Sequence, residues 1–267
     1  AEVVALDDGA TEIVVLEGTT GALVTSTTNR ATTDGNTNHQ WYDRMNVAYL
    51  DGIHPYLVAQ NTHFASGQPI FVSGFRLVRD ATTVSLVRSV DFQWNQSVGT
   101  HGLPVADLDG NGRDEIVPCG KALQLAGGQL VERWTIPHSS EGFVKPHDDT
   151  CFVADLVPTQ LGLETFFGIE RNSAPLPDGL GVVTKDGTVL WSRPNGMFPD
   201  SGLPGEDESS FHGWEKGGCF QSITGNGGME CYVFEICEDN GCMGAYDLDT
   251  GDYWTRSYIL NAGTGAV

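Results

Sequence analysis

A short acidic sequence, VADLDGNGRDEIV at Val105–Val117, recurs in modified form along the chain. Each copy consists of an apolar stretch, an acidic or glycine-containing turn and a second stretch rich in Val, Ile, Phe or Tyr, as expected for two short strands. A repeated unit of this kind indicates an array of similar β units rather than one irregular domain. The repeat segments cover residues 3–18, 47–60, 105–120, 153–168 and 221–235.

A second pair of predicted strands follows each repeat segment. Gly-Gly, Asp-Gly and Thr-Gly dipeptides at their turns supply the positive φ that tight hairpins require. Four strands per unit, at a spacing of roughly 45–65 residues, are typical of propeller blades. We therefore predict an all-β fold, a β-propeller-like array of about five four-stranded blades that forms a single domain over residues 1–267. The alternative is a β-sandwich whose turns resemble one another by coincidence.

The charge balance excludes several classes of partner. The chain has 35 Asp and Glu against 14 Lys and Arg, a formal net charge of −21. Because no basic stripe is available to neutralise phosphates, neither nucleic acid nor an anionic membrane surface is an expected partner. No apolar run is long enough to span a bilayer. The chain begins at Ala1 without a methionine or a signal peptide, from which we expect a processed product.

Six cysteines suggest disulfides and an oxidising, extracellular compartment, so we expect a secreted protein. One pair flanks a tight turn, one brackets the fifth repeat turn, and the third would tie neighbouring blades. These pairs are Cys237 with Cys242, Cys219 with Cys231, and Cys119 with Cys151. Asn95 begins the sequence Asn-Gln-Ser, a weakly specific glycosylation acceptor.

The third repeat carries the spacing of a calcium loop. Side-chain oxygens stand at positions 1, 3, 5 and 9, a backbone carbonyl at position 7, and a glycine at position 6 permits the sharp turn. We predict that calcium binds there, and that the other repeats have too few carboxylates to hold it. The predicted ligands are Asp107, Asp109, Asn111, the carbonyl of Arg113, and Glu115.

Four stretches of the chain form an ordered set of motifs. They are DRMNVAYLDGIHPYLVAQ (Asp43–Gln60), HGLPVADLDGNGRDEIV (His101–Val117), HDDTCFVADLVPTQLGLETFFGIE (His147–Glu170) and VVTKDGTVLWSR (Val182–Arg193). In this order they resemble the rhamnogalacturonan lyases of polysaccharide lyase family 11. The resemblance implies a β-propeller that depends on calcium and cleaves the pectin backbone by β-elimination. The family propeller has eight blades, so this chain looks like a shortened relative.

A second set of candidate metal ligands precedes and follows the fourth repeat. His101 and His147 stand at equivalent points before two successive repeats, and Asp149 is two residues beyond His147, on the same side of an extended strand. Together with Glu170, they match residues that hold an internal metal ion in the resembled family. Two imidazoles and two carboxylates suit calcium, zinc or manganese. The alternative is that the histidines only form hydrogen bonds with neighbouring strands.

The sequence identifies no catalytic residue. A lyase must neutralise a uronate carboxylate and remove the C5 proton, and Lys145, Arg171 and Tyr42 lie near the motifs without matching a catalytic position. Three functions therefore stay open: a secreted polysaccharide lyase, a non-catalytic propeller that binds glycans or builds an extracellular structure, and an adhesion module of the integrin-repeat type. The expected partner is an acidic polysaccharide. Exposed strand edges would also invite self-association.

Overall fold

The computed structural model describes residues 2–7, 11–29, 42–61, 70–94, 99–100, 102–118, 120–136, 147–170, 179–194, 216–221, 229–236, 246–247, 252–253, 255–261 and 264. For residues 94, 99–100, 147–150, 169–170, 179–180 and 193–261 the description covers the backbone alone. In this part of the chain the regular elements are all β-strands. No helix there is long and apolar enough to cross a membrane.

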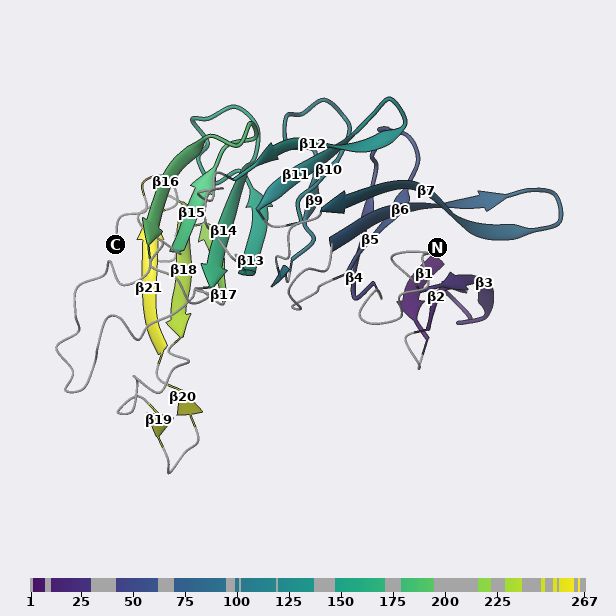
Figure 1. Ribbon diagram of the computed structural model, residues 1–267, viewed down its shortest axis with the longest axis horizontal. Coiled ribbons are helices and arrows are strands. Elements are labelled where there is room, and N and C mark those ends of the chain that lie inside the picture. The colour runs from purple at the N-terminus through teal and green to yellow at the C-terminus, as the bar shows by residue number, and fades with distance from the viewer. Residues whose placement is uncertain are drawn as a thin grey trace.

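The strands form successive antiparallel sheets (Figure 1). The first sheet contains β1 (Glu2–Leu6), β2 (Glu12–Glu17) and β3 (Leu23–Thr28). The second contains β4 (Arg44–Ala48), β5 (Tyr56–Gln60), β6 (Ile70–Arg79) and β7 (Val84–Trp94). The third contains β9 (Val105–Ala106), β10 (Glu115–Ile116), β11 (Lys121–Ala126) and β12 (Gln129–Thr135).

The fourth sheet contains β13 (His147–Ala154), β14 (Glu164–Glu170), β15 (Gly179–Val183) and β16 (Val189–Pro194), with β8 (Gly99–Thr100) added in parallel to β13. The fifth contains β17 (Lys216–Gln221), β18 (Met229–Ile236) and β21 (Thr255–Asn261). A separate hairpin consists of β19 (Tyr246–Asp247) and β20 (Asp252–Tyr253).

The predicted repeat is confirmed at the level of strand pairs. Each of the five repeat segments contains the turn between the first two strands of one sheet. The second, third and fourth sheets have the predicted four antiparallel strands in sequence order. Among the described residues the first and fifth sheets have three strands each. A fourth strand of the first sheet is not tested, because residues 30–41 lie outside the description. In the fifth sheet the expected hairpin is wrong, because its residues divide between the separate β19–β20 hairpin and β21, which pairs with β18.

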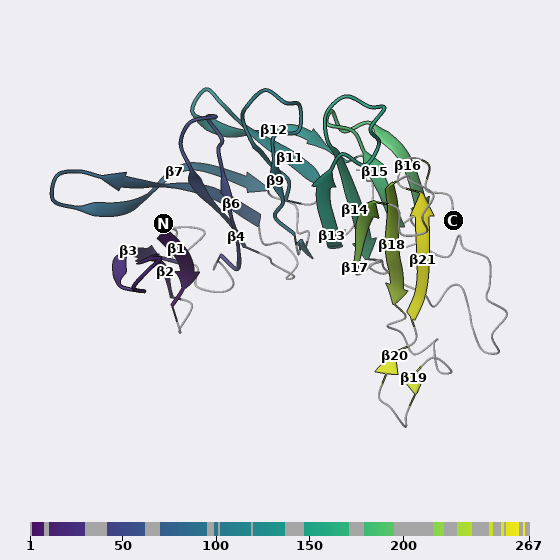
Figure 2. The ribbon, with the colours of Figure 1, turned by 180° about the vertical axis from the view of Figure 1, so that it is seen from behind.

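Successive sheets pack face to face. Figures 1 and 2 show the sheets following one another side by side in an arc, with the β6–β7 hairpin projecting from it. First strands lie against first strands (β4 with β9, β13 with β17), and last strands lie against last strands (β3 with β7, β7 with β12). The sheets are therefore stacked in the same orientation, as the blades of a propeller are.

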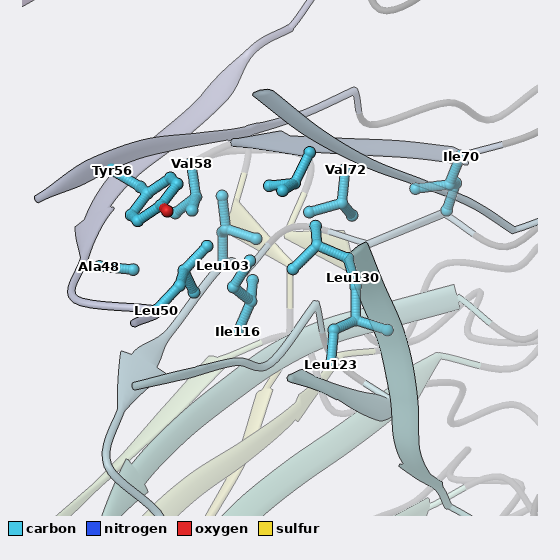
Figure 3. Close-up of a cluster of buried hydrophobic side chains, with 11 residues drawn as sticks. Ala48, Leu50, Tyr56, Val58, Ile70, Val72, Leu103, Ile116, Leu123 and Leu130 are labelled. Atoms are coloured by element: carbon cyan, nitrogen blue, oxygen red, sulfur yellow. The ribbon is translucent and has the colours of Figure 1, made fainter. Parts of the chain in front are cut away.

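The hydrophobic core consists of separate clusters, each between two neighbouring sheets. Strand β5 shows why, because it is buried along its whole length and its side chains alternate between two clusters. Tyr56 and Val58 join the cluster against the third sheet (Figure 3), whereas Leu57 and Ala59 join the cluster against the first. A third cluster, which includes Leu108, Trp134, Ile136 and Phe167, lies between the third and fourth sheets.

Candidate cation-binding site

The turn between β9 and β10 is held in shape by its own acidic side chains. The carboxylate of Asp107 accepts hydrogen bonds from the backbone N–H of Asn111 (2.9 Å) and of Gly112 (2.7 Å). The Asn111 side chain accepts one from the N–H of Arg113 (2.9 Å). Gly112 has φ +86° and Gly110 has φ +76°, a region that favours glycine. The predicted sharp turn is therefore present.

Glu115 brings a carboxylate to the same point from the interior. Its side chain is only 2% exposed, and its Oε2 accepts a hydrogen bond from the N–H of Leu108 (2.9 Å). Burial raises the pKa of this carboxyl, although the Leu108 N–H and the charge of Arg133 oppose the shift. One oxygen each from Asp107, Asp109 and Glu115 lies within 4.8 Å of the others. Carboxylate oxygens so close together suit a hard divalent cation.

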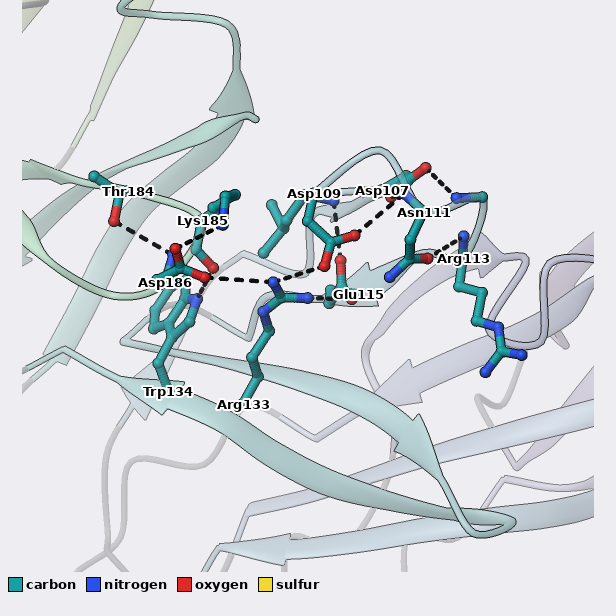
Figure 4. Close-up of polar contacts among 12 residues, drawn as sticks. Asp107, Asp109, Asn111, Arg113, Glu115, Arg133, Trp134, Thr184, Lys185 and Asp186 are labelled. Atoms are coloured by element: carbon teal, nitrogen blue, oxygen red, sulfur yellow. Dashed lines mark hydrogen bonds and ion pairs between the residues drawn. The ribbon is translucent and has the colours of Figure 1, made fainter. Parts of the chain in front are cut away.

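Arg133, which no motif in the sequence indicated, lies among these carboxylates (Figure 4). Its two terminal nitrogens are each 2.8 Å from a carboxylate oxygen, one from Oδ2 of Asp109 and the other from Oε1 of Glu115. The side chain is 13% exposed, so solvent screens these ion pairs little. A third carboxylate, that of Asp186 in the fourth sheet, has Oδ1 3.6 Å from the guanidinium.

The residues present fit a cation, because the carboxylates and the turn geometry of a calcium loop are in place. Asp107, Asp109, Asn111, the Arg113 carbonyl and Glu115 would hold it. The two oxygens that Arg133 binds belong to predicted ligands, so the guanidinium and the cation would share these groups.

The acidic turn joins three sheets. On one side, Asp114 Oδ2 accepts a hydrogen bond from the N–H of Tyr49 (2.6 Å), and the Asp114 N–H donates to the Tyr49 carbonyl (3.1 Å). On the other side, the N–H of Leu163 donates to the carbonyl of Leu108 (2.9 Å). A side chain at Gly162 would lie 2.5 Å from that carbonyl oxygen, so the fourth-sheet turn approaches as closely as backbone permits.

Arg133 lies at a β-bulge between strands β11 and β12. Leu123 pairs with Glu132 and Ala122 with Trp134, so Arg133 is the extra residue of a β-bulge. The fourth sheet has the same bulge, where Val183 pairs with Val189 and Val182 with Trp191. The extra residue there is Leu190.

The carboxylates that face these bulges are also equivalent. Glu115 pairs with Ala106, and Glu164 pairs with Ala154 one repeat later. Glu164 is 0% exposed, and its Oε2 accepts hydrogen bonds from two backbone N–H groups, those of Leu156 (3.0 Å) and Val157 (2.9 Å). Among the described residues its Oε1 has no hydrogen-bond partner. The bulge position that holds an arginine in the third sheet holds Leu190 in the fourth, a residue without a hydrogen-bond donor in its side chain.

In the second repeat, hydrogen bonds fill the turn, as the sequence predicted. Asp51 Oδ1 accepts from the N–H groups of Ile53 (2.9 Å) and His54 (2.7 Å), and Oδ2 lies 2.8 Å from His54 Nδ1. These contacts, which outweigh burial, lower the pKa of the Asp51 carboxyl well below its usual range. In the first repeat the Asp7 carboxylate likewise accepts hydrogen bonds from the Thr11 hydroxyl (2.8 Å) and the Glu12 N–H (2.7 Å). In the fourth, the Glu164 carboxylate accepts hydrogen bonds from the N–H groups of Leu156 and Val157. The turn of the fifth repeat lies outside the described residues.

The backbone places two of the four residues of the predicted histidine site, His147 and Glu170, opposite one another. His147 pairs directly with Glu170, and β8 places Gly99 and Thr100 opposite His147 and Asp148. His101 follows Thr100 in the chain but lies outside the described residues. The register shifts between Asp148 and Thr150, so the strand alternation used to align His147 with Asp149 is interrupted there. The side chains of His147, Asp149 and Glu170 are outside the description, and the metal site stays a prediction.

Three of the six predicted disulfide cysteines lie within the described residues. Cys219 and Cys231 are direct partners on the adjacent strands β17 and β18, and antiparallel partners have Cα atoms about 4.5–5.5 Å apart, within disulfide range. Cys151, in β13, is not a free thiol. The remaining predicted cysteines and the glycosylation acceptor lie outside the described residues: Cys119, Cys237, Cys242 and Asn95.

Among the residues considered for catalysis, Tyr42 belongs to the core. It is 1% exposed, packs edge-on against Phe75, and its hydroxyl lies 2.5 Å from Ser73 Oγ. Burial raises the pKa of Tyr42, which disfavours a role as base. Lys145 and Arg171 lie outside the described residues.

Stacked antiparallel sheets with an acidic turn define this chain as an all-β repeat protein with a candidate cation loop. Residues 4–228 match the family described as "Rhamnogalacturonan lyase family 11, C-terminal domain". The chain belongs to that family. The resemblance read from the sequence is therefore confirmed.

Two relatives come from Bacillus subtilis (strain 168). Rhamnogalacturonan exolyase YesX is 30% identical over 200 residues, which cover 70% of this chain and 29% of the relative. Rhamnogalacturonan endolyase YesW is 26% identical over 188 residues, which cover 66% of this chain and 27% of the relative. The chain thus matches less than a third of either relative's length. No solved structure matches it.

Proposed function

We propose that this protein is a secreted, cation-dependent polysaccharide lyase that cleaves acidic pectic or algal polysaccharide by β-elimination. The observation that carries the proposal is the family match over residues 4–228. Its relatives' names identify a rhamnogalacturonan exolyase and an endolyase. A rhamnogalacturonan backbone is accordingly the first substrate to test. The proposal covers calcium at the Asp107–Glu115 loop, whose carboxylates lie within 4.8 Å of one another.

The same proposal includes a radial, propeller-like arrangement of the blades within one domain. It is supported by the stacking of first strands on first strands and of last strands on last strands. Disulfides and an extracellular location are part of it, supported by the direct pairing of Cys219 with Cys231.

A second metal, tied to His101, His147, Asp149 and Glu170, is supported by the pairing of His147 with Glu170 and of β8 with β13. Because a ligating imidazole is neutral, affinity should fall as the pH drops below the histidine pKa of about 6.5. His147→Ala should lose one equivalent of bound metal by elemental analysis. An unchanged stoichiometry would leave a hydrogen-bonded cluster as the explanation.

The test of the lyase proposal is the release of unsaturated uronides, followed by ultraviolet absorbance. The chain is incubated with rhamnogalacturonan, homogalacturonan and ulvan-type polymer, with calcium or with EDTA. Release from at least one polymer in calcium, and its loss in EDTA, is the expected result. No release from any polymer would overturn the proposal.

The second candidate function is a non-catalytic propeller that binds glycans or builds an extracellular structure, with capacity to associate with its own copies. One observation favours it, because groups of the acidic turn bond to the sheets on both sides through Tyr49 and Leu163. Such contacts suit a cation that stiffens the stack. Binding of the polymer in affinity electrophoresis without unsaturated products would support this candidate.

A further inference from the structure

We propose that Arg133 is a displaceable internal cation of the acidic loop. Without calcium the guanidinium occupies the carboxylates of Asp109 and Glu115, and calcium binding transfers it to Asp186 on the fourth sheet. Cation binding at the third repeat thereby strengthens the contact between the third and fourth sheets. This inference deepens the proposed function and rests on the calcium loop that it contains.

Arg133 and a bound calcium ion would compete for the same carboxylate oxygens. Arg133 lies 2.8 Å from Asp109 Oδ2 and 2.8 Å from Glu115 Oε1. The second oxygen of each carboxylate is already engaged with backbone N–H groups, those of Asn111 and Leu108. A cation bound by these two carboxylates would therefore compete with the guanidinium for Asp109 Oδ2 and Glu115 Oε1.

Asp186 offers the arginine a further carboxylate outside the acidic loop. Asp186 Oδ1 is 3.6 Å from the guanidinium, while its Oδ2 accepts a hydrogen bond from Lys185 (2.6 Å). The turn that carries Asp186 is fixed beside Arg133, because the Trp134 indole N–H donates to the Lys185 carbonyl (2.9 Å). Figure 4 shows the guanidinium between the loop carboxylates and Asp186, so the second partner is already next to it.

The next repeat has the same bulge and an equivalent buried glutamate but no arginine at the bulge. The bulge position holds Arg133 in the third sheet and Leu190 in the fourth, and Arg133 contacts Glu115. Glu115 Oε1 has a guanidinium, whereas no hydrogen-bond partner of Glu164 Oε1 is found in the described part of the chain. The arginine is thus no requirement of the bulge or of the glutamate. It occurs in the one repeat whose turn carries the full calcium-loop spacing.

The experiment measures calcium affinity by isothermal titration calorimetry for the intact chain and three variants. Arg133→Leu should bind calcium on the order of tenfold more tightly, because loop charge sets affinity. Arg79→Leu is the matched control. It makes the same substitution at an exposed arginine of the second sheet, which pairs with Glu2 and is no predicted ligand. Because salt screens exposed charges outside the loop, its affinity should stay within about threefold. Asp186→Asn should weaken binding several-fold by removing the displaced arginine's partner.

Thermal unfolding gives a second readout. In EDTA, Arg133→Leu should unfold at a lower temperature than the parent, because buried Glu115 loses its counter-charge. In calcium the order should reverse or the difference vanish. Should Arg133→Leu not fold without calcium, Arg133→Lys, which cannot bridge both carboxylates, and Asp186→Asn carry the test.

The outcomes separate the two proposals. If the parent binds no calcium at this loop, and Asp109→Asn changes nothing, the calcium loop itself is refuted. If the parent binds calcium through Asp109 but Arg133→Leu and Arg79→Leu shift affinity equally, the displacement by calcium is wrong and the loop stands. Unchanged affinity in Asp186→Asn would overturn the transfer to the fourth sheet.

Discussion

Glu164→Gln should stabilise the protein, an unusual outcome for a change at a fully buried residue. Glu164 Oε2 accepts two backbone hydrogen bonds, which the glutamine carbonyl can keep, while its Oε1 has no partner among the described residues. A buried charged acceptor without a partner costs about 1–3 kcal/mol. Glutamine replaces that oxygen with an N–H2 group that itself needs an acceptor, so only part of this cost is recovered. We expect a gain of about 1 kcal/mol, which raises Tm by about 2–4 °C for a chain of this length.

Glu115→Gln is the matched control, at the equivalent position one repeat earlier. There the lost charge breaks the 2.8 Å contact with Arg133, a hydrogen bond to a charged group. The expected cost is about 1.5–3 kcal/mol. Two identical substitutions should therefore have opposite signs, because Glu115 is paired with an arginine, whereas Glu164 Oε1 has no partner among the described residues.

The pH dependence supplies an independent check on Glu164. Burial raises the pKa of this carboxyl above its usual value, against the two backbone N–H groups that lower it. The folded protein therefore binds the proton more tightly than the unfolded chain. The parent should gain stability relative to Glu164→Gln as the pH falls from 7 through the raised pKa, and the gain should be complete below the unfolded pKa of about 4.3.

The measurement is urea unfolding of parent and both variants in EDTA, at pH 7 and near pH 4.5. The reasoning is refuted if Glu164→Gln loses as much stability as Glu115→Gln at pH 7. That result would mean that Glu164 meets a positive partner in the folded protein.

Two further predictions concern turns. Gly162→Ala should cost about 2–3 kcal/mol in urea unfolding, because φ is +94° and the new Cβ would lie 2.5 Å from the Leu108 carbonyl oxygen. Gly21→Ala, at φ +71° but in open space, should cost only about 1 kcal/mol, and equal costs would contradict the close approach. Thr83→Val should raise the pKa of Asp80 from about 2 toward its usual value in an NMR titration, because the Thr83 hydroxyl is the main cause of the depression. An unchanged Asp80 pKa would show that backbone N–H groups alone hold it down.

Much of the local structure could be predicted from the sequence. Apolar stretches on either side of an acidic turn predicted the paired strands of all five repeats, since strand propensity and turn chemistry act over a few residues. The internal hydrogen bonds of the Asp107–Glu115 turn follow from the same local spacing. The assignment of strands to sheets depends on longer-range pairing, and it was wrong in the fifth sheet, where β21 and not the β19–β20 hairpin pairs with β18.

Arg133 could not be found by comparing repeats, because the three equivalent bulge positions hold Ser89, Arg133 and Leu190. A bulge inserts one residue into the strand, and nothing in a single sequence marks where. The same limit applies to Asp149, where a register shift interrupts the alternation that the sequence argument used.

The most direct test of the cation loop and its arginine is a crystal structure of the protein grown with calcium. The account predicts a calcium ion about 2.3–2.6 Å from oxygens of Asp107, Asp109, Asn111, Arg113 and Glu115. It also predicts the guanidinium of Arg133 paired with Asp186. A loop without calcium, with Arg133 still bonded to Asp109 and Glu115, would contradict it.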